Sequence, residues 1–242
     1  MSKYIHSEEI HNLKTPTSIT PLIMEVLNPK SVLDVGCGLG TWLKSFEQLG
    51  VHEILGVDSN WVDRKMLKIL PNQFYVHDLT EPLNLQRKFD LVISLEVAEH
   101  VDESLSKQFV QSLVNHGDLI LFSAAIPGQG GQHHVNEKWL SAWVEIFKLF
   151  NYKVFDFIRP AIWNEPAIEL WYKQNIVLFC KEGHPLELPL RKYEPAFIDM
   201  VHPELFTFYR NQAERSIQLE QGRLGFQLAM KAFVNALINK FK

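Results

Sequence analysis

The sequence predicts an α/β fold in which a mostly parallel sheet carries helices on both faces. Apolar stretches with strand character alternate with helical stretches at the length of βα units. The runs Leu91-Val-Ile and Leu119-Ile-Leu-Phe are apolar throughout, as in strands buried on both sides. The first strand also runs directly into Gly36, Gly38 and Gly40, a turn that allows close backbone approach to a ligand.

The expected elements follow one another along the chain. Residues 18–28 form a predicted helix that ends before Pro29. The remaining pattern predicts strands near 31–36, 53–58, 73–77, 89–94 and 117–123, and helices near 40–49, 60–69, 104–114 and 137–150. Two further strands, 153–158 and 175–180, are joined by a long aromatic loop. After Pro203, apolar residues three or four apart predict a C-terminal helical extension.

Four segments in this order carry a resemblance to a known family. The segment Leu33-Asp-Val-Gly-Cys-Gly-Leu-Gly40 resembles motif I of the class I S-adenosylmethionine-dependent methyltransferases. The next two strands end in Asp58 and Asp78, and Glu96-Val-Ala-Glu-His100 is similar to the family's motif IV. The resemblance covers about residues 18 to 180. It implies a Rossmann-like, mostly parallel seven-stranded sheet in which the strand at 175–180 runs antiparallel.

The resemblance also implies the cofactor, S-adenosyl-L-methionine, with S-adenosyl-L-homocysteine as its product. The glycine loop would wrap the methionine part, and a carboxylate at Asp58 can accept both ribose hydroxyls. Asp78 would accept from the adenine amino group, and the backbone N–H of Leu79 would meet the ring. The full set of predicted cofactor-binding residues is Asp34, Gly36, Cys37, Gly38, Gly40, Asp58, Ser59, Asp78, Leu79, Leu95 and Glu96.

The segment after the fifth expected strand supplies candidate catalytic residues. Between Ala125 and Trp139 it holds three glycines followed by two histidines. Methyl transfer to a hydroxyl needs a base, and histidine is the usual one near neutral pH. The candidate bases are His134, His133 and His100. Candidate substrate contacts, taken largely from the long loop expected over the cofactor edge, are Glu99, Trp163, Asn164, Trp171 and Tyr172.

A metal site is an alternative that the sequence does not favour. Glu96, Glu99 and His100 form E-x-x-E-H, which resembles the metal-binding half of the small-RNA 2′-O-methyltransferases, and His134 would be the fourth ligand. Such an ion would orient vicinal hydroxyls and lower the acceptor's pKa. The same pattern also occurs in methyltransferases without a metal. A net charge of -4 and the lack of a basic patch interleaved with aromatics argue against nucleic acid as a partner.

Taken together, these residues predict O-methylation of a small polar acceptor. The acceptor that we expect is a sugar or a sugar-linked biosynthetic intermediate, as in surface-polysaccharide and natural-product pathways, because aromatic faces suit sugar rings. Two alternatives remain open. One is a metal-dependent RNA 2′-O-methyltransferase, and the other is a cofactor-binding partner subunit without catalysis.

The ends of the chain and its composition complete the picture. We expect an N-terminal arm or lid over residues 1–17, the cofactor-binding domain over 18–182, and an irregular linker with a C-terminal helix over 183–242. That helix is a candidate homodimer contact. With no apolar run of about 18 residues, no signal-peptide core and only two cysteines, we expect a cytoplasmic protein.

Overall fold

The computed structural model describes residues 12–221, 230–231 and 233–235. The chain divides into two compact units, Met1–Met200 and Val201–Lys242. Helix α1 begins at Lys14, four residues before the predicted start. The rest of the expected N-terminal arm lies mostly outside the described residues, as do several apolar positions of the expected C-terminal stripe.

The first unit is built on a seven-stranded sheet with strand order β3-β2-β1-β4-β5-β7-β6. Its strands are β1 (Ser31–Val35), β2 (Glu53–Asp58), β3 (Phe74–Val76), β4 (Leu91–Leu95), β5 (Leu119–Ser123), β6 (Tyr152–Phe155) and β7 (Val177–Lys181). β7 pairs antiparallel with both β5 and β6, whereas the other recorded pairs are parallel. The predicted mostly parallel sheet, including its one antiparallel strand, is confirmed.

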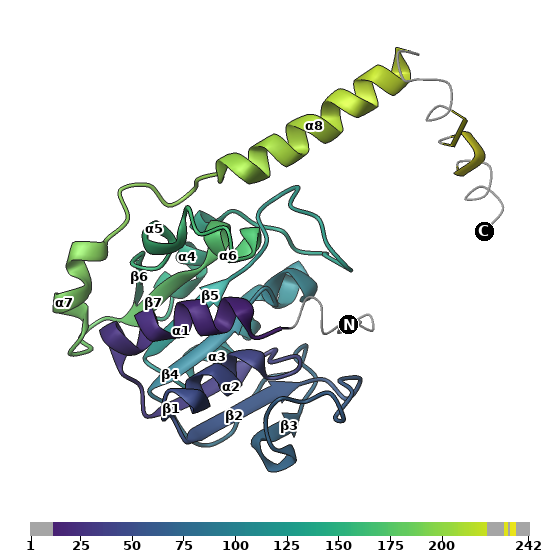
Figure 1. Cartoon of the computed structure of the whole chain (residues 1–242). Coiled ribbons are helices and arrows are strands. Elements are labelled where there is room, and N and C mark those ends of the chain that lie inside the picture. The colour runs from purple at the N-terminus through teal and green to yellow at the C-terminus, as the bar shows by residue number, and fades with distance from the viewer. Residues whose placement is uncertain (1–11, 222–229, 232, 236–242) are drawn as a thin grey trace. The chain divides into compact units, whose positions relative to one another are not determined.

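Helices cover both faces of this sheet, and Figure 1 shows α1 and α2 lying across one of them. The helices of the first unit are α1 (Lys14–Leu27), α2 (Thr41–Gln48), α3 (Ser106–Val114), α4 (Leu140–Lys148), α5 (Arg159–Ile162), α6 (Leu170–Asn175) and α7 (Glu187–Leu190). Ile19 and Ile23 of α1 and Phe46 of α2 belong to one buried apolar cluster. Phe109 of α3 and Phe147 of α4 belong to the cluster on the opposite face. These four helices are therefore held on the sheet by their buried apolar residues.

The strand order places a ligand site at one edge of the sheet. From β1 the chain proceeds outward through β2 to β3, and from β4 it proceeds the other way to β5. In open α/β sheets ligands bind beyond the carboxyl ends of the strands, where the order reverses. Here the reversal lies between β1 and β4, which pair directly at Asp34 and Ile93.

Two local predictions were wrong. The helix expected at 60–69 is a series of turns, because the backbone N–H of Lys68 donates to the carbonyl of Leu39 (2.8 Å) and Ile69 packs against Gly40. These tertiary contacts with the glycine loop outweigh the weak helix propensity of the segment. The stretch from Arg159 to Gln174, expected as one long loop, contains α5 and most of α6.

The second unit contains α8 (Pro203–Glu220), which confirms the predicted C-terminal helix. Three apolar side chains on this helix are exposed by half or more: Phe206 (59%), Phe208 (52%) and Ile217 (50%). Nothing in the structure tests the homodimer expected there, so it stays a prediction. Among the described helices, none is long and apolar enough to cross a membrane.

Candidate active site

A cavity of about 300 Å³ opens at the carboxyl ends of β1, β2, β4 and β5. Its walls come from separate parts of the chain: α1, the glycine loop, the ends of β2 and β3, the turn after β4, the segment after β5, and α6. The predicted site residues that line it are Asp34, Gly36, Cys37, Gly38, Asp58, Leu79, Leu95, Glu96, Glu99, His100, His134, Trp171 and Tyr172. Residues far apart in the sequence therefore converge on one site, as the pattern of strand ends predicted.

The glycine loop after β1 is fixed by its neighbours on both sides. Gly36 has a φ of +86°, and a Cβ added there would lie 2.4 Å from a methyl of Val97. Its N–H, together with that of Cys37, donates to the carbonyl of Val57 at 2.8 and 3.2 Å. Glycine is needed at 36 because the backbone is left-handed and because the turn after β4 packs directly against it.

Two buried carboxylates lie beside this loop. Asp58 Oδ2 accepts from the N–H of Gly38 at 2.7 Å, and its Oδ1 accepts from the N–H of Ser59 at 2.6 Å. Asp34 is 3% exposed, and its Oδ2 has no hydrogen-bond partner among the described residues. Burial, and then the nearby charge of Asp58, raise the pKa of Asp34 well above its usual value. A cationic group beside Asp34 would satisfy that oxygen and restore the ionised form.

The end of β3 contributes only part of what was predicted. Leu79 is buried and lines the cavity. Asp78 is exposed and lies outside the cavity wall, and its Oδ1 accepts from the N–H and hydroxyl of Thr80. These hydrogen bonds lower the pKa of Asp78. Ser59 and Gly40 also lie outside the wall. The cofactor-binding roles of all the predicted residues stay predictions, and the structure does not bring these three to the cavity.

Glu96 occupies a strained position directly after β4. Its φ is +55°, in the left-handed region that non-glycine residues seldom adopt, which is typical of functional sites. One carboxylate oxygen accepts from Gln129 Nε2 (3.0 Å) and the other from Asn175 Nδ2 (3.1 Å). Burial raises the pKa of Glu96 to about 7, against these hydrogen bonds, which lower it. The turn thus aims the carboxyl group of Glu96 into the cavity.

Glu99, one turn further on, is fully buried at 0% exposure. Neither of its carboxylate oxygens has a hydrogen-bond partner in the described part of the chain. Burial, and then the charge of Glu96, raise the pKa of Glu99 well above its usual value. Ligand atoms of Glu99, His100 and His134 all lie within 4.8 Å of one another. A buried acid and two imidazoles in this arrangement can share a proton or hold a cation.

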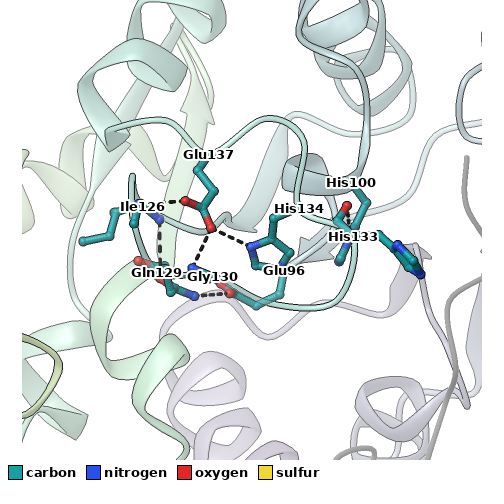
Figure 2. Close-up of polar contacts among 10 residues, drawn as sticks. Glu96, His100, Ile126, Gln129, Gly130, His133, His134 and Glu137 are labelled. Carbon is teal, nitrogen blue, oxygen red and sulfur yellow. Dashed lines mark hydrogen bonds and ion pairs between the residues drawn. The ribbon is translucent and has the colours of Figure 1, made fainter. Parts of the chain in front are cut away.

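His134 is held by a carboxylate that the sequence analysis did not single out. Its Nδ1–H donates to Glu137 Oε1 at 2.9 Å, and Figure 2 shows Glu137 between His134 and the glycine-rich segment. Glu137 also accepts from the N–H groups of Gly128 and Gly130, both at 2.7 Å. This contact leaves Nε2 of His134 as the nitrogen with a free lone pair, which is the form a general base requires.

The other two candidate bases differ from His134. The His100 ring meets the His134 ring edge-on, with centroids 4.9 Å apart, and its Nδ1–H donates to the carbonyl of His133 (3.4 Å; Figure 2). His133 itself is exposed and lies outside the cavity wall. Of the three histidines, the structure brings His100 and His134 into the cavity.

An aromatic wall faces these polar groups. Trp42 and Tyr172 meet edge-on with ring centroids 5.3 Å apart, and Trp171 lines the cavity beside them. Trp163 and Asn164, which follow α5, do not line the cavity. Of the predicted substrate contacts, Glu99, Trp171 and Tyr172 therefore line the cavity, whereas Trp163 and Asn164 do not.

Several residues that build the site were not among the predictions: Gln129, Glu137, Glu169, Asn175 and Trp42. Gln129 and Asn175 act through hydrogen bonds to Glu96, which lies 33 and 79 residues away in the sequence. Glu137 alone carried a usable signal, since it lies three residues after His134 and close to the glycines of the same segment.

The methyltransferase domain family matches residues 12–159. The tRNA U34 carboxymethyltransferase of Pseudomonas syringae pv. tomato is 31% identical over 162 residues, covering 61% of this chain and 45% of that protein. The mitochondrial ubiquinone biosynthesis O-methyltransferase of Dictyostelium discoideum is 33% identical over 132 residues, covering 46% and 38%. The chain thus spans less than half the length of these curated relatives.

Solved structures share the fold at low identity. Streptomyces venezuelae DesVI matches with a TM-score of 0.54 and 13% identity, covering 74% of this chain and 100% of that one. The methyltransferase domain of bacterial CtHen1-C matches with a TM-score of 0.51 and 17% identity, covering 70% and 99%. These matches agree with the Rossmann-like sheet described above.

Proposed function

Because this chain belongs to the methyltransferase domain family, of the class I S-adenosylmethionine-dependent kind, we propose that it methylates a hydroxyl of a small, uncharged, polar acceptor. The observation that carries the proposal is the position of His134, inside the cavity with Nδ1 held by Glu137. An acceptor hydroxyl must lose a proton as its oxygen is methylated, and this arrangement provides the base.

The residues on the β1 and β2 side fit S-adenosylmethionine. The unpartnered Oδ2 of Asp34 suits the cationic amino group of the methionine part. Asp58 holds the glycine loop through Gly38, and a carboxylate at the end of β2 suits ribose hydroxyls. Leu79 provides an apolar surface at the end of β3 for the adenine ring. When bound, the cofactor supplies a methyl group on a positively charged sulfur, the leaving group of an in-line displacement.

The residues beyond β4 and β5 then act on the acceptor. With the cofactor bound, the acceptor oxygen would bond to the methyl carbon as the S–C bond breaks, and the electron pair of the broken S–C bond would stay on sulfur. His134 Nε2 takes the hydroxyl proton, and Glu137 stabilises the resulting imidazolium through Nδ1–H. Positioning of the acceptor against the donor supplies much of the rate in such a reaction.

We infer the acceptor class from the cavity walls. Trp171 and Tyr172 present aromatic surface, which suits the apolar faces of a sugar ring, and Glu99 and His100 can hydrogen-bond its hydroxyls. This favours a sugar or sugar-linked compound. The tRNA-modifying relatives favour a nucleic acid, but the described residues that line the cavity include no lysine or arginine to meet phosphates.

The test is direct. The purified protein is incubated with S-adenosylmethionine carrying a labelled methyl group and with two sets of acceptors, uncharged sugars or sugar-linked compounds and bulk tRNA. We expect label on a sugar hydroxyl and none in tRNA. Label found in tRNA, or on nitrogen rather than oxygen, would overturn the proposed acceptor class.

A second candidate function is favoured by one observation, the cluster of Glu99, His100 and His134. If a divalent ion binds there, these side chains would orient vicinal hydroxyls and lower the acceptor's pKa, as in a metal-dependent RNA 2′-O-methyltransferase. Addition of Mn²⁺ to the chelator-treated protein tests this. A rise in melting temperature that disappears in Glu99→Gln, together with metal-dependent methylation of RNA, would support it. Full sugar methylation in excess EDTA would count against it.

A further inference from the structure

One buried polar atom in the cavity wall, Nε2 of Gln132, is a hydrogen-bond donor without an acceptor. Among the described residues of the wall, the other buried side-chain atoms without a hydrogen-bond partner are carboxylate oxygens of Asp34, Glu99 and Glu169. An amide nitrogen can only donate. Because a buried donor without an acceptor is costly, Gln132 points to a partner with a lone pair that binds from outside the chain.

Gln129, three residues earlier, shows how an amide of the same segment is used for structure. Its Nε2 donates to Glu96 Oε2 at 3.0 Å, and its Oε1 accepts from Asn175 Nδ2 at 2.9 Å. The amide of Gln129 is therefore used within the chain, where it joins the segment to β4 and α6. The buried Nε2 of Gln132 has no such contact among the described residues. The two glutamines therefore differ in role, and Gln132 is the one with a donor left for a ligand.

The backbone on either side of Gln132 contacts the two histidines of the cavity. A Cβ added at Gly131 would lie 2.2 Å from Nε2 of His134, so the chain just before Gln132 lies against the proposed base. Just after Gln132, the carbonyl of His133 accepts from Nδ1–H of His100 at 3.4 Å. The side chain of Gln132 lines the same cavity. An acceptor hydroxyl placed against Nε2 of His134 therefore lies beside the Gln132 amide.

The chemistry of the transfer decides which oxygen the amide can usefully hold. The reacting oxygen uses a lone pair to bond to the methyl carbon, and a hydrogen bond donated to that pair would make the oxygen a weaker nucleophile. A hydrogen bond donated to a neighbouring oxygen has no such cost, and it orients the acceptor toward the base. The donor of Gln132 therefore suits an oxygen next to the one that is methylated.

We propose that Gln132 binds the acceptor, with Nε2 donating to an oxygen adjacent to the hydroxyl that is methylated. The site thus selects acceptors with two neighbouring oxygens, such as a vicinal diol or a hydroxyl beside the ring or glycosidic oxygen of a sugar. Sites that hydrogen-bond a substrate oxygen discriminate against analogues that lack it, because the buried donor is then left unpaired. This inference rests on the proposed function and adds the residue that recognises the second oxygen of the acceptor.

The experiment uses a set of methyl hexopyranosides as acceptors, with S-adenosylmethionine carrying a labelled methyl group. The methylated position of the best acceptor is mapped by NMR, and deoxy analogues lacking each oxygen next to that position are then compared. Gln132→Met removes the donor and keeps an unbranched side chain of similar length. For the best acceptor we expect Gln132→Met to lower kcat/KM by about tenfold, mainly through a higher KM. One deoxy analogue should lose about the same factor with the wild-type protein and nothing further with Gln132→Met.

Gln111→Met is the matched control, because the Gln111 amide is exposed on α3 and donates to Asn115 just after the same helix at 2.8 Å. Its kinetics should equal those of the wild-type protein. S-adenosylhomocysteine should bind to Gln132→Met within about twofold of wild type, which checks that the cavity is intact. Gln132→Glu, which has the same shape but an oxygen in place of the donor, serves if Gln132→Met does not fold, and it should raise KM at least as much.

Two results would overturn the inference and leave the proposed function intact. One is an unchanged KM for the best acceptor in the Gln132 variants, and the other is an equal loss by Gln132→Met on every deoxy analogue. If the wild-type protein binds S-adenosylhomocysteine but labels none of the glycosides, the proposed acceptor class is wrong, and this inference fails with it.

Discussion

The two halves of the cavity are built in different ways. The half at β1, β2 and β3 is made of short contiguous motifs, in which backbone N–H groups and Asp58 lock the glycine loop in place. The half beyond β4 and β5 is made of side chains from three distant segments, joined by hydrogen bonds such as those of Glu96 with Gln129 and Asn175. The first half is therefore shaped mainly by backbone, and the second half is formed mainly by polar side chains.

This difference suggests a division of labour. The first half needs close backbone approach to the cofactor. The second half needs particular charges and a base, which depend on the acceptor. Substitutions in the first half should therefore change cofactor affinity, whereas substitutions in the second half should change the methylation rate and leave cofactor affinity nearly unchanged.

The largest expected effect is on turnover. His134→Ala removes the proposed base, so we expect the methylation rate to fall by about 100- to 10,000-fold. Cofactor affinity should stay within about twofold, because His134 lies in the other half of the cavity. Steady-state kinetics with the identified acceptor gives the rate. Full turnover in His134→Ala would contradict the assignment of His134 as the base in the second half of the cavity.

The second expected effect is on the glycine loop. Gly36→Ala would place a Cβ 2.4 Å from Val97 on a backbone with φ +86°. We expect a loss of about 2–4 kcal/mol in the free energy of unfolding, with loss of cofactor binding. Gly50→Ala is the control, because Gly50 has a φ of +91° but nothing within 4 Å of an added Cβ. Chemical denaturation of both variants checks this, and equal losses would mean that Val97 contributes nothing.

The third effect is on stability as a function of pH. The pKa of Glu96 is about 7 in the folded protein and near 4.5 when unfolded, so the unfolded chain gives up the proton first as pH rises. The wild-type protein should therefore lose stability between about pH 4.5 and pH 7. Relative to it, Glu96→Gln should gain about 1–3 kcal/mol from pH 5 to pH 8. A stability difference that does not change with pH would contradict the burial of this group.

The smallest effect is expected for Glu137→Gln. The amide has one acceptor oxygen in place of two, so it cannot accept from Gly128 as well as from Gly130 and His134. It also carries no charge, so the contact that fixes the protonated nitrogen of His134 is weakened. We expect the rate to fall by about tenfold with little change in cofactor affinity. The ¹⁵N NMR shifts of His134 should show a mixture of tautomers. An unchanged tautomer with an unchanged rate would mean that Glu137 only shapes the loop.

The same contrast explains what the sequence could predict. Asp34, Gly36 and Asp58 were predicted because strand ends and glycines are local signals that place residues at one sheet edge. Glu99 and His134 were predicted as candidates, but their proximity was not visible from spacing alone. Asn175 was missed because its partner Glu96 is 79 residues away. The failed helix at 60–69 has the same cause, a long-range contact with Leu39 and Gly40.

The most direct test of the division between the two halves is calorimetric titration of S-adenosylhomocysteine into three proteins: wild type, Asp58→Asn and His134→Ala. We predict that Asp58→Asn weakens binding by about 10- to 100-fold, the value of hydrogen bonds to a charged group, and that His134→Ala binds within about twofold of wild type. An equal loss of S-adenosylhomocysteine affinity in both variants, or a loss in His134→Ala alone, would contradict the division between the two halves of the cavity.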